Sequence, residues 1–312
     1  SLCYIFFESF QLVYIYLNYI LITSSSSNFA NFPCRSLTVD RYTLWNYNPV
    51  CTAPTNGRNS IWRTVMSEFV AYFNGDWVPN SEVYIKPFDR GFTMGDAVFD
   101  VERTFNGKLF RLKDHMDRLY RSLQYSRIDT GLTVEEMSEI TEETVRRNES
   151  MRPAGGDFSV RQVVTRGTTD SWTQGNVTDE LTPTVINMVS IMDFSLHAKY
   201  YETGASVVIP ASRSYSSISV DPKVKHYSRA NFVQAQLQVA DVDPHAFPVL
   251  LDQNGNITEN VGGNFFIVTD GVIRTSRDQS ILQGISRRVA IELAEQLGIP
   301  IVEEDLQPYD AY

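Results

Sequence analysis

The sequence predicts a two-domain α+β protein, with a smaller N-terminal α/β domain and a larger, β-rich C-terminal domain. The length of 312 residues, with 43% hydrophobic and 21% charged residues, suits two ordinary globular domains. β-rich runs separated by Asn-Gly and Asp-Gly turns alternate with a few amphipathic stretches. A change of composition across residues 191–203 indicates a linker, which places the domains at residues 66–192 and 193–312.

Residues 1–65 do not fit this pattern. Residues 2–22 are almost continuously apolar and are long enough for one membrane span, whereas residues 24–64 show no periodicity. The first convincing element follows Met66. We therefore expect Met66 to be the native start and residues 1–65 to be a non-native or disordered leader, with a membrane anchor through residues 2–22 as the alternative.

The N-terminal domain is expected to combine strands joined by tight turns with two helices. Asn74-Gly75 and Asn106-Gly107 readily adopt the positive φ angles of two-residue hairpins. Apolar residues three or four apart indicate a helix from Asp114, and Thr133 with Glu136 forms a capping box that begins a second helix. We expect residues 89–96 to be a loop, and the following segments to be strands: 69–73, 77–78, 83–85, 97–105, 108–112, 158–164 and 184–190.

The C-terminal domain is expected to be mostly β. A helix is predicted over residues 231–239 and another from Ser286, with Leu293 and Leu297 facing the core and Gly298 at its end. The predicted strands are residues 205–210, 247–251, 257–258, 265–268, 272–275 and 299–302.

Charge and cysteine usage narrow the possible partners. The formal net charge of -10 argues against nucleic acid, because neutralising phosphates requires clustered Lys and Arg. The three cysteines, Cys3, Cys34 and Cys51, have neither CxxC nor Cys/His spacing, so no metal site is predicted. Small molecules and proteins remain as partners.

Three motifs could carry chemistry together. Lys225 follows an apolar residue, and desolvation favours the neutral amine that attacks an aldehyde. Glu259 precedes Gly262-Gly263, where backbone can approach a planar ligand, and a carboxylate there can keep a pyridine nitrogen protonated. Gly284-Ile285-Ser286 at a helix start offers amides to a phosphate, to which Arg118 could add a bidentate contact. Taken singly, each is more often a structural or solvated residue.

In this order the motifs resemble those of the class IV, or fold-type IV, pyridoxal-phosphate enzymes. The resemblance covers about residues 69–312 and implies pyridoxal 5'-phosphate as cofactor and Lys225 as the Schiff-base lysine and proton shuttle. It also implies Glu259 at the pyridine nitrogen, and Arg118 with the Ile285 and Ser286 amides at the phosphate. The family includes branched-chain aminotransferases, D-amino-acid aminotransferases, (R)-amine transaminases and aminodeoxychorismate lyase.

The choice within the family depends on the substrate side of the site. Asp100-Val101 resembles the D-amino-acid and (R)-amine enzymes, whereas Arg103 and Arg161 occupy positions where branched-chain enzymes have arginine. Because two arginines can engage a substrate carboxylate, we favour a branched-chain-like transaminase with Phe99, Arg103 and Arg161 as substrate residues. An (R)-amine or D-amino-acid transaminase is the second reading, and Lys225-His-Tyr-Ser-Arg229 also resembles the lyase.

The resemblance further implies a cytoplasmic homodimer that takes an amino donor and a 2-oxo acid such as 2-oxoglutarate. Members of the family continue beyond the point that corresponds to Asp310-Ala-Tyr312, with a strand and a Thr/Ser-rich loop that completes the site. We therefore expect this chain to be a fragment. The alternative from a different functional class is a non-catalytic protein: a truncated or membrane-anchored remnant that binds the cofactor without turnover.

Overall fold

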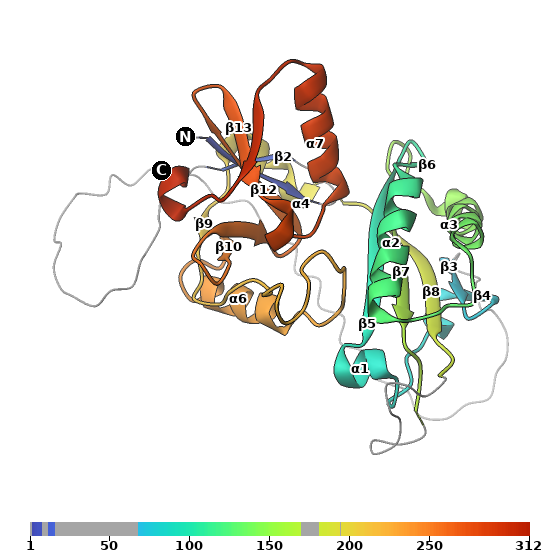
Figure 1. The fold of residues 1–312 in the computed structure, drawn as a ribbon. Helices are drawn as coiled ribbons and strands as arrows, with labels where there is room; N and C mark the ends of the chain where they lie inside the picture. Colours follow the sequence, from blue (N-terminus) through green and yellow to red (C-terminus); the bar gives the residue numbers. More distant parts are fainter. Residues whose placement is uncertain (1, 8–11, 16–67, 170–180, 194) are drawn as a thin grey trace, which may run out of the picture. The chain divides into compact units, whose positions relative to one another are not determined.

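The computed structural model describes residues 2–7, 12–15, 68–169, 181–193 and 195–312, which form one compact unit built on two β-sheets (Figure 1). The predicted α+β class is confirmed. The N-terminal sheet has the strand order β4-β3-β8-β7-β5-β6, and its neighbours are antiparallel. Its strands are β3 (Val70–Phe73), β4 (Asp76–Pro79), β5 (Ala97–Phe105), β6 (Lys108–Leu109), β7 (Phe158–Thr165) and β8 (Thr184–Ile191).

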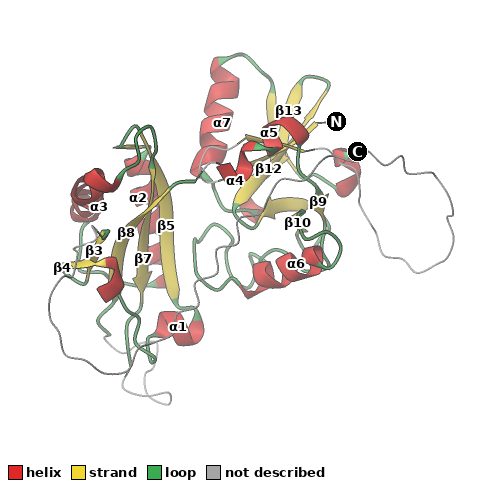
Figure 2. Ribbon diagram, turned by 180° about the vertical axis from the view of Figure 1, so that it is seen from behind, coloured by secondary structure: helices red, strands yellow, loops and turns green. Residues whose placement is uncertain are grey.

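Two amphipathic helices cover one face of the N-terminal sheet, α2 (Leu112–Ser126) and α3 (Val134–Asn148) (Figure 2). Met116 and Leu119 are completely buried, because residues three or four apart on α2 point at the sheet. The predicted capping box is present: the Glu136 amide donates to Thr133 Oγ1 at 3.1 Å, and the Thr133 amide donates to Glu136 Oε2 at 2.8 Å. Both hairpins predicted from Asn-Gly are also present, which confirms this part of the fold.

Three short segments of the N-terminal half differ from expectation. Of the predicted strand 108–112, only Lys108–Leu109 is a strand, and α2 already begins at Leu112. Residues 83–85 form no strand, because the chain follows a 3-10 turn, η1 (Asn80–Glu82), into an unpaired stretch. Residues 89–96 contain a short helix, α1 (Arg90–Met94), instead of a loop alone. Asp89 Oδ1 accepts from the Gly91 amide at 2.7 Å, and Gly95 ends the helix with φ of 67°, so local capping decides this segment.

The C-terminal sheet has the order β14-β13-β12-β11-β10-β9, with parallel pairing only between β9 and β10 and between β13 and β14 among these described strands. Its core brings together side chains such as Val249, Phe265 and Ile267. Its strands are β9 (Val207–Val208), β10 (Phe247–Leu251), β11 (Ile257–Asn260), β12 (Gly263–Thr269), β13 (Val272–Ser276) and β14 (Ile301–Glu304).

Helices flank this sheet. α6 (Ala230–Ala240) packs Phe232 and Ala235 against Leu250. α7 (Ile285–Gln296) begins one residue earlier than predicted, and Val289 and Ala294 are buried on it. Leu293 and Leu297 are 49% and 72% exposed, so the prediction that they face the core is wrong. The remaining short helices are α4 (Ser195–Ala198), α5 (Tyr200–Thr203), η2 (Glu149–Met151), η3 (Asp278–Ser280) and η4 (Pro308–Ala311).

Two parts of the apolar segment 2–22 form β-strands. β1 (Leu2–Phe7) pairs antiparallel with β12, from Leu2 opposite Val268 to Phe7 opposite Gly263, and β2 (Leu12–Ile15) pairs with β1. Within the described residues, no helix has the length and apolar character needed to cross a membrane. The proposal that residues 1–65 precede the native start remains a prediction, and residues 16–65 lie outside the described part.

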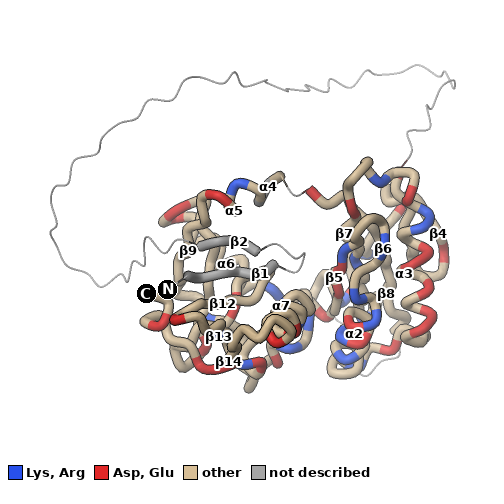
Figure 3. The backbone as a smooth tube through the Cα atoms, turned by 90° about the horizontal axis from the view of Figure 1, so that it is seen from above, with Lys and Arg blue, Asp and Glu red and all other residues tan. Residues whose placement is uncertain are grey.

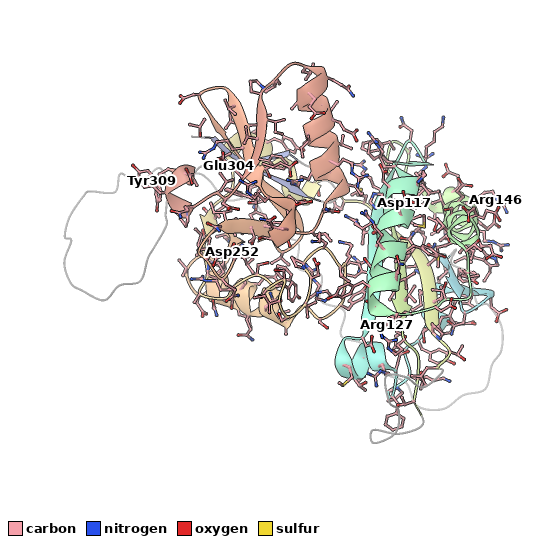
Figure 4. The ribbon with its side chains drawn as sticks, viewed as in Figure 1. Asp117, Arg127, Arg146, Asp252, Glu304 and Tyr309 are labelled. Carbon is pink, nitrogen blue, oxygen red and sulfur yellow. The ribbon has the colours of Figure 1, made fainter. Side chains whose placement is uncertain are left out.

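The outer faces of the two long helices are charged. Several acidic residues, drawn red, follow one another along α3 (Figure 3). Ion pairs one helical turn apart join Lys113 to Asp117 on α2 and Glu143 to Arg146 on α3. Asp117 and Arg146 are labelled on the two helices in Figure 4. These ion pairs are thus carried by solvated faces, away from the apolar faces that pack on the sheet.

Candidate active site

One pocket beside the C-terminal sheet collects the residues of three motifs that are far apart in the sequence. Its walls come from the extended segment before α6, the turn between β11 and β12, and the first turn of α7. Lys225, Glu259, Gly284 and Ser286 all line this pocket. The fold therefore brings together four of the residues that the sequence singled out. The other candidates do not line this pocket: Phe99, Arg103, Arg118, Arg161 and Ile285.

Lys225 is fixed by its backbone. The Phe99 amide of β5 donates to Lys225 O at 3.0 Å, and the Tyr227 amide donates to Ala97 O at 2.9 Å, so residues 225–227 lie against an edge of β5. The Lys225 amide also donates to Ser122 Oγ on α2 at 3.2 Å. The lysine is 3% exposed, and its Nζ lies 4.6 Å from the centroid of the Phe99 ring. Lys225 is thus a buried amine on a rigid support.

Glu259 is held on β11, directly opposite Asn264 of β12. Its Oε2 accepts from the Leu282 amide at 3.1 Å and from Asn264 Nδ2 at 3.3 Å. The residue is 6% exposed. A buried carboxylate held in this way is well placed to accept a hydrogen bond from a protonated nitrogen of a ligand in the same pocket.

The first turn of α7 presents backbone amides to the pocket. Gly284 is the N-cap and no side chain caps this end, while the first amides of a helix have no acceptor within it. Ser286 is 3% exposed, and its Oγ has no hydrogen-bond partner among the described residues. A Cβ at Gly284 would fall 2.1 Å from Asn264 Oδ1, so only glycine lets these two segments approach so closely. This arrangement suits an anion.

Arg118 lies on the buried face of α2, 2% exposed, and is not a solvated helix residue. Its Nε and Nη2 donate to Asp100 Oδ2 and Oδ1 at 2.8 and 2.7 Å. Nη1 donates to Gln283 O, next to the start of α7, at 3.3 Å. Burial alone would raise the pKa of Asp100, but the charge of Arg118 and hydrogen bonds from Arg118 and His115 outweigh it and hold this pKa below its usual range.

The predicted substrate residues divide into two groups. Phe99 packs on Tyr227 with ring centroids 4.3 Å apart, and the Arg161 guanidinium lies 5.9 Å from the Phe99 centroid. Arg103 instead engages Asp157 at 3.4 Å and donates from Nε to Thr104 O at 3.0 Å. Phe99 is therefore beside the Lys225 amine and Arg161 is next to Phe99, while the structure gives Arg103 other partners. The substrate role of all three residues stays a prediction.

Comparison with known proteins gives a consistent result. The family model described as "Amino-transferase class IV" matches residues 97–312. The chain belongs to the class IV aminotransferases. The "Putative branched-chain-amino-acid aminotransferase" of Methanocaldococcus jannaschii is 38% identical over 244 residues, which cover 77% of this chain and 80% of that protein. A "D-alanine aminotransferase" of Staphylococcus epidermidis is 27% identical over 236 residues, 75% of this chain and 78% of its own.

Solved structures agree with the fold of this aminotransferase. The crystal structure of the branched-chain aminotransferase from Thermoproteus uzoniensis with norvaline has a TM-score of 0.66 at 26% identity, over 78% of this chain and 80% of that one. A branched-chain aminotransferase from T.th. with pyridoxamine 5'-phosphate has a TM-score of 0.69 at 24% identity, over 78% of both chains. Class IV aminotransferases depend on pyridoxal phosphate, so this chain is a pyridoxal-phosphate-dependent aminotransferase.

The pocket of the aminotransferase suits this cofactor. Its buried amine (Lys225), buried carboxylate (Glu259) and glycine-capped helix start can meet an aldehyde, a pyridine nitrogen and a phosphate respectively. The Ser286 hydroxyl, without a partner among the described residues, lies at the expected phosphate end. The donor set therefore fits pyridoxal phosphate, and the assignment of each residue to a cofactor atom stays a prediction.

Sequence reasoning missed the residues that support the aminotransferase site. Asp100, Ser122 and Tyr227 touch Arg118, Lys225 and Phe99, but none had been assigned to the site. A signal was available for one of them: Asp100 and Glu102 occupy alternate positions of the predicted strand 97–105, and both are at most 1% exposed. Carboxylates on the buried side of a strand require partners, which pointed to a nearby cation.

Proposed function

We propose that this aminotransferase moves an amino group between a branched-chain amino acid and a 2-oxo acid such as 2-oxoglutarate. The observation that carries the proposal is the position of Arg161, an exposed arginine that lies over the Phe99 ring beside the lysine amine. Among the described residues Arg161 has no carboxylate partner within ion-pair distance, so its charge is available to a substrate carboxylate. Relatives named as branched-chain aminotransferases support the same choice.

The residues of the chain divide the work of transamination. When bound, pyridoxal phosphate supplies an electron sink for negative charge at the substrate α-carbon. Lys225 would hold the cofactor covalently until the amino group of the donor displaces it, and its freed Nζ would then take the proton from the α-carbon and return it. Glu259 would hold a proton on the pyridine nitrogen, and Arg118 with the Ile285 and Ser286 amides would hold the phosphate. Arg161 and Phe99 would orient the substrate over Lys225.

Amino donors of different stereochemistry test this proposal. L-leucine, D-alanine and (R)-1-phenylethylamine are each offered with 2-oxoglutarate or pyruvate, and the keto product is measured. We expect L-leucine with 2-oxoglutarate to give the highest kcat/KM. A preference for D-alanine or the (R)-amine would replace the branched-chain proposal while leaving the family unchanged.

Replacement of the lysine separates an enzyme from a cofactor-binding remnant. Lys225→Ala should abolish turnover and the visible absorbance band of the bound cofactor, because no other residue is proposed to hold the cofactor covalently. Turnover by Lys225→Ala at the wild-type rate would contradict the proposed mechanism. A wild-type protein that binds the cofactor but converts no donor would favour the remnant.

We also infer that the enzyme is a homodimer. Large apolar side chains outside both sheets are exposed, including Tyr84 at 59%, Phe92 at 71% and Met94 at 67%. We infer that these side chains belong to one apolar patch at the subunit interface, because contiguous exposed apolar surface is typical of such interfaces. Light scattering during size exclusion should give twice the mass of one chain, whereas the mass of a single chain would contradict the inference. The cytoplasmic location stays a prediction from the sequence.

A further inference from the structure

Asp100 is saturated with hydrogen bonds although it is completely buried. Oδ1 accepts from Arg118 Nη2 at 2.7 Å and from the Val101 amide at 2.8 Å, and His115 Nδ1 lies 2.7 Å from the same oxygen. Oδ2 accepts from Arg118 Nε at 2.8 Å. Both oxygens therefore act on groups whose positions are fixed by β5 and α2.

This arrangement determines the orientation of the Arg118 guanidinium. Because the guanidinium is planar, two contacts from one edge to the two oxygens of Asp100 fix its plane. The third nitrogen, Nη1, is then directed at Gln283 O, 3.3 Å away and one residue before the α7 N-cap. Asp100 thus turns the arginine towards the helix start that carries Ser286.

The same part of the protein also fixes Lys225. Phe99, the neighbour of Asp100 on β5, donates its amide to Lys225 O at 3.0 Å. Ser122 Oγ donates to Arg118 O at 2.9 Å and accepts from the Lys225 amide at 3.2 Å. The lysine and the arginine are therefore tied to one strand and one helix, which sets the separation between them.

We propose that Asp100, supported by His115, is a positioning residue that sets the orientation of Arg118 towards the cofactor phosphate. The inference rests on the proposed role of Arg118 and adds a residue that does not itself contact the cofactor. Its consequence is specific: loss of Asp100 weakens the recognition of the phosphate and leaves recognition of the pyridoxal ring unchanged.

Comparing two ligands separates this role from a general effect on folding. Dissociation constants of pyridoxal 5'-phosphate and of pyridoxal, which lacks the phosphate, are measured by absorbance titration of full-length protein. Asp100→Asn should raise the dissociation constant of pyridoxal phosphate about 10-fold, as expected for the loss of one or two charge-assisted hydrogen bonds. The dissociation constant of pyridoxal should change less than about 2-fold. His115→Leu should shift the same ratio in the same direction by a smaller factor, and provides the test if Asp100→Asn does not fold.

Asp96→Asn is the matched control. Asp96 bridges Arg90 and Arg166 at 3.1 and 2.6 Å, next to the start of β5, and is outside the proposed cofactor site. It should leave the ratio of the two dissociation constants unchanged. The inference would be overturned if Asp100→Asn weakened the binding of both ligands equally. It would also be overturned if the ratio of the two dissociation constants stayed unchanged in both Asp100→Asn and His115→Leu. Failure of the wild-type protein to bind pyridoxal phosphate would instead overturn the proposed function.

Discussion

Lys225, Glu259 and Arg118 owe their chemistry to burial with directed partners. Each is at most 6% exposed, and charged groups that are nearly removed from water require fixed hydrogen bonds. Glu259 receives them from the Leu282 amide and from Asn264, and Arg118 donates its own to Asp100. The side chains of Glu259 and Arg118 are therefore held in place before a ligand arrives, which reduces the cost of ordering them on binding.

Removing the charge of Glu259 tests its proposed role at the pyridine nitrogen. Glu259→Gln keeps the size of the side chain but cannot hold a proton on that nitrogen, so we expect kcat to fall about 100-fold. Cofactor content, read from absorbance, should remain close to wild type. A kcat within a few-fold of wild type would place the pyridine nitrogen elsewhere.

His226 gives the stability of the protein a pH dependence. The residue is 8% exposed and neither ring nitrogen has a hydrogen-bond partner among the described residues; burial, with a smaller contribution from the charge of Arg229, lowers its pKa from 6.5 to about 4. Because the unfolded chain binds this proton at a higher pH than the folded chain, the free energy of unfolding is unaffected above pH 6.5 and falls as the pH is lowered towards 4.

Urea unfolding at pH 7 and pH 5 measures this effect. From pH 7 to pH 5 the free energy of unfolding of the wild type should fall by about 1–2 kcal/mol more than that of His226→Gln, which has no imidazole to protonate. His245→Gln, at an exposed position, serves as the control and should behave like the wild type. Equal losses in the wild type and His226→Gln would show that His226 is not responsible.

The secondary-structure elements act as supports that carry the site residues. β5 is central: its even-numbered residues face the covering helices and include Asp100, while its backbone at Ala97 and Phe99 binds the segment around Lys225. α2 contributes Arg118 and Ser122 one turn apart on its buried face. A substitution that weakens these contacts should therefore affect the cofactor even where it does not touch the pocket.

Ser122→Ala tests the link between α2 and the lysine. It removes the hydroxyl that accepts from the Lys225 amide, and a buried amide that loses its acceptor should lower the free energy of unfolding by about 1–3 kcal/mol. The matched control is Ser138→Ala on α3, where Oγ donates to Val134 O at 2.7 Å in the same local pattern. Equal losses of stability in both variants, measured in urea, would show that the contact with Lys225 adds nothing.

The elements themselves were largely predictable from local patterns. The Asn-Gly hairpins, the capping box at Thr133 and the apolar stripe of α2 depend on neighbouring residues, and each appears where expected. Errors arose where periodicity was read without its surroundings. Leu293 continues the helical spacing of α7 but is 49% exposed, because the helix buries only its first turns and Ala294.

The proposed cofactor-binding residues lie between positions 118 and 286 of the sequence, and all of them therefore follow Met66. A chain shortened to begin at Met66 should therefore retain the absorbance of the bound cofactor. Because β12 would lose its pairing with β1 along residues 263–268, we expect a lower Tm than for the full chain. Loss of the cofactor from the shortened chain would show that residues 1–65 belong to the functional fold.

The sequence by itself indicated the class of chemistry, because a lysine, a glutamate before two glycines and a Gly-Ile-Ser helix entry stand in the order that resembles the class IV pyridoxal-phosphate enzymes. Each of these motifs taken singly carries little information. The sequence also determined most elements, since hairpins, caps and amphipathic stripes depend on near neighbours. The tertiary structure alone decided that Arg118 is buried on Asp100, that Arg103 turns to Asp157, and that Tyr227 packs on Phe99. These contacts join residues distant in sequence, and their geometry depends on how strands and helices pack, which no local pattern records.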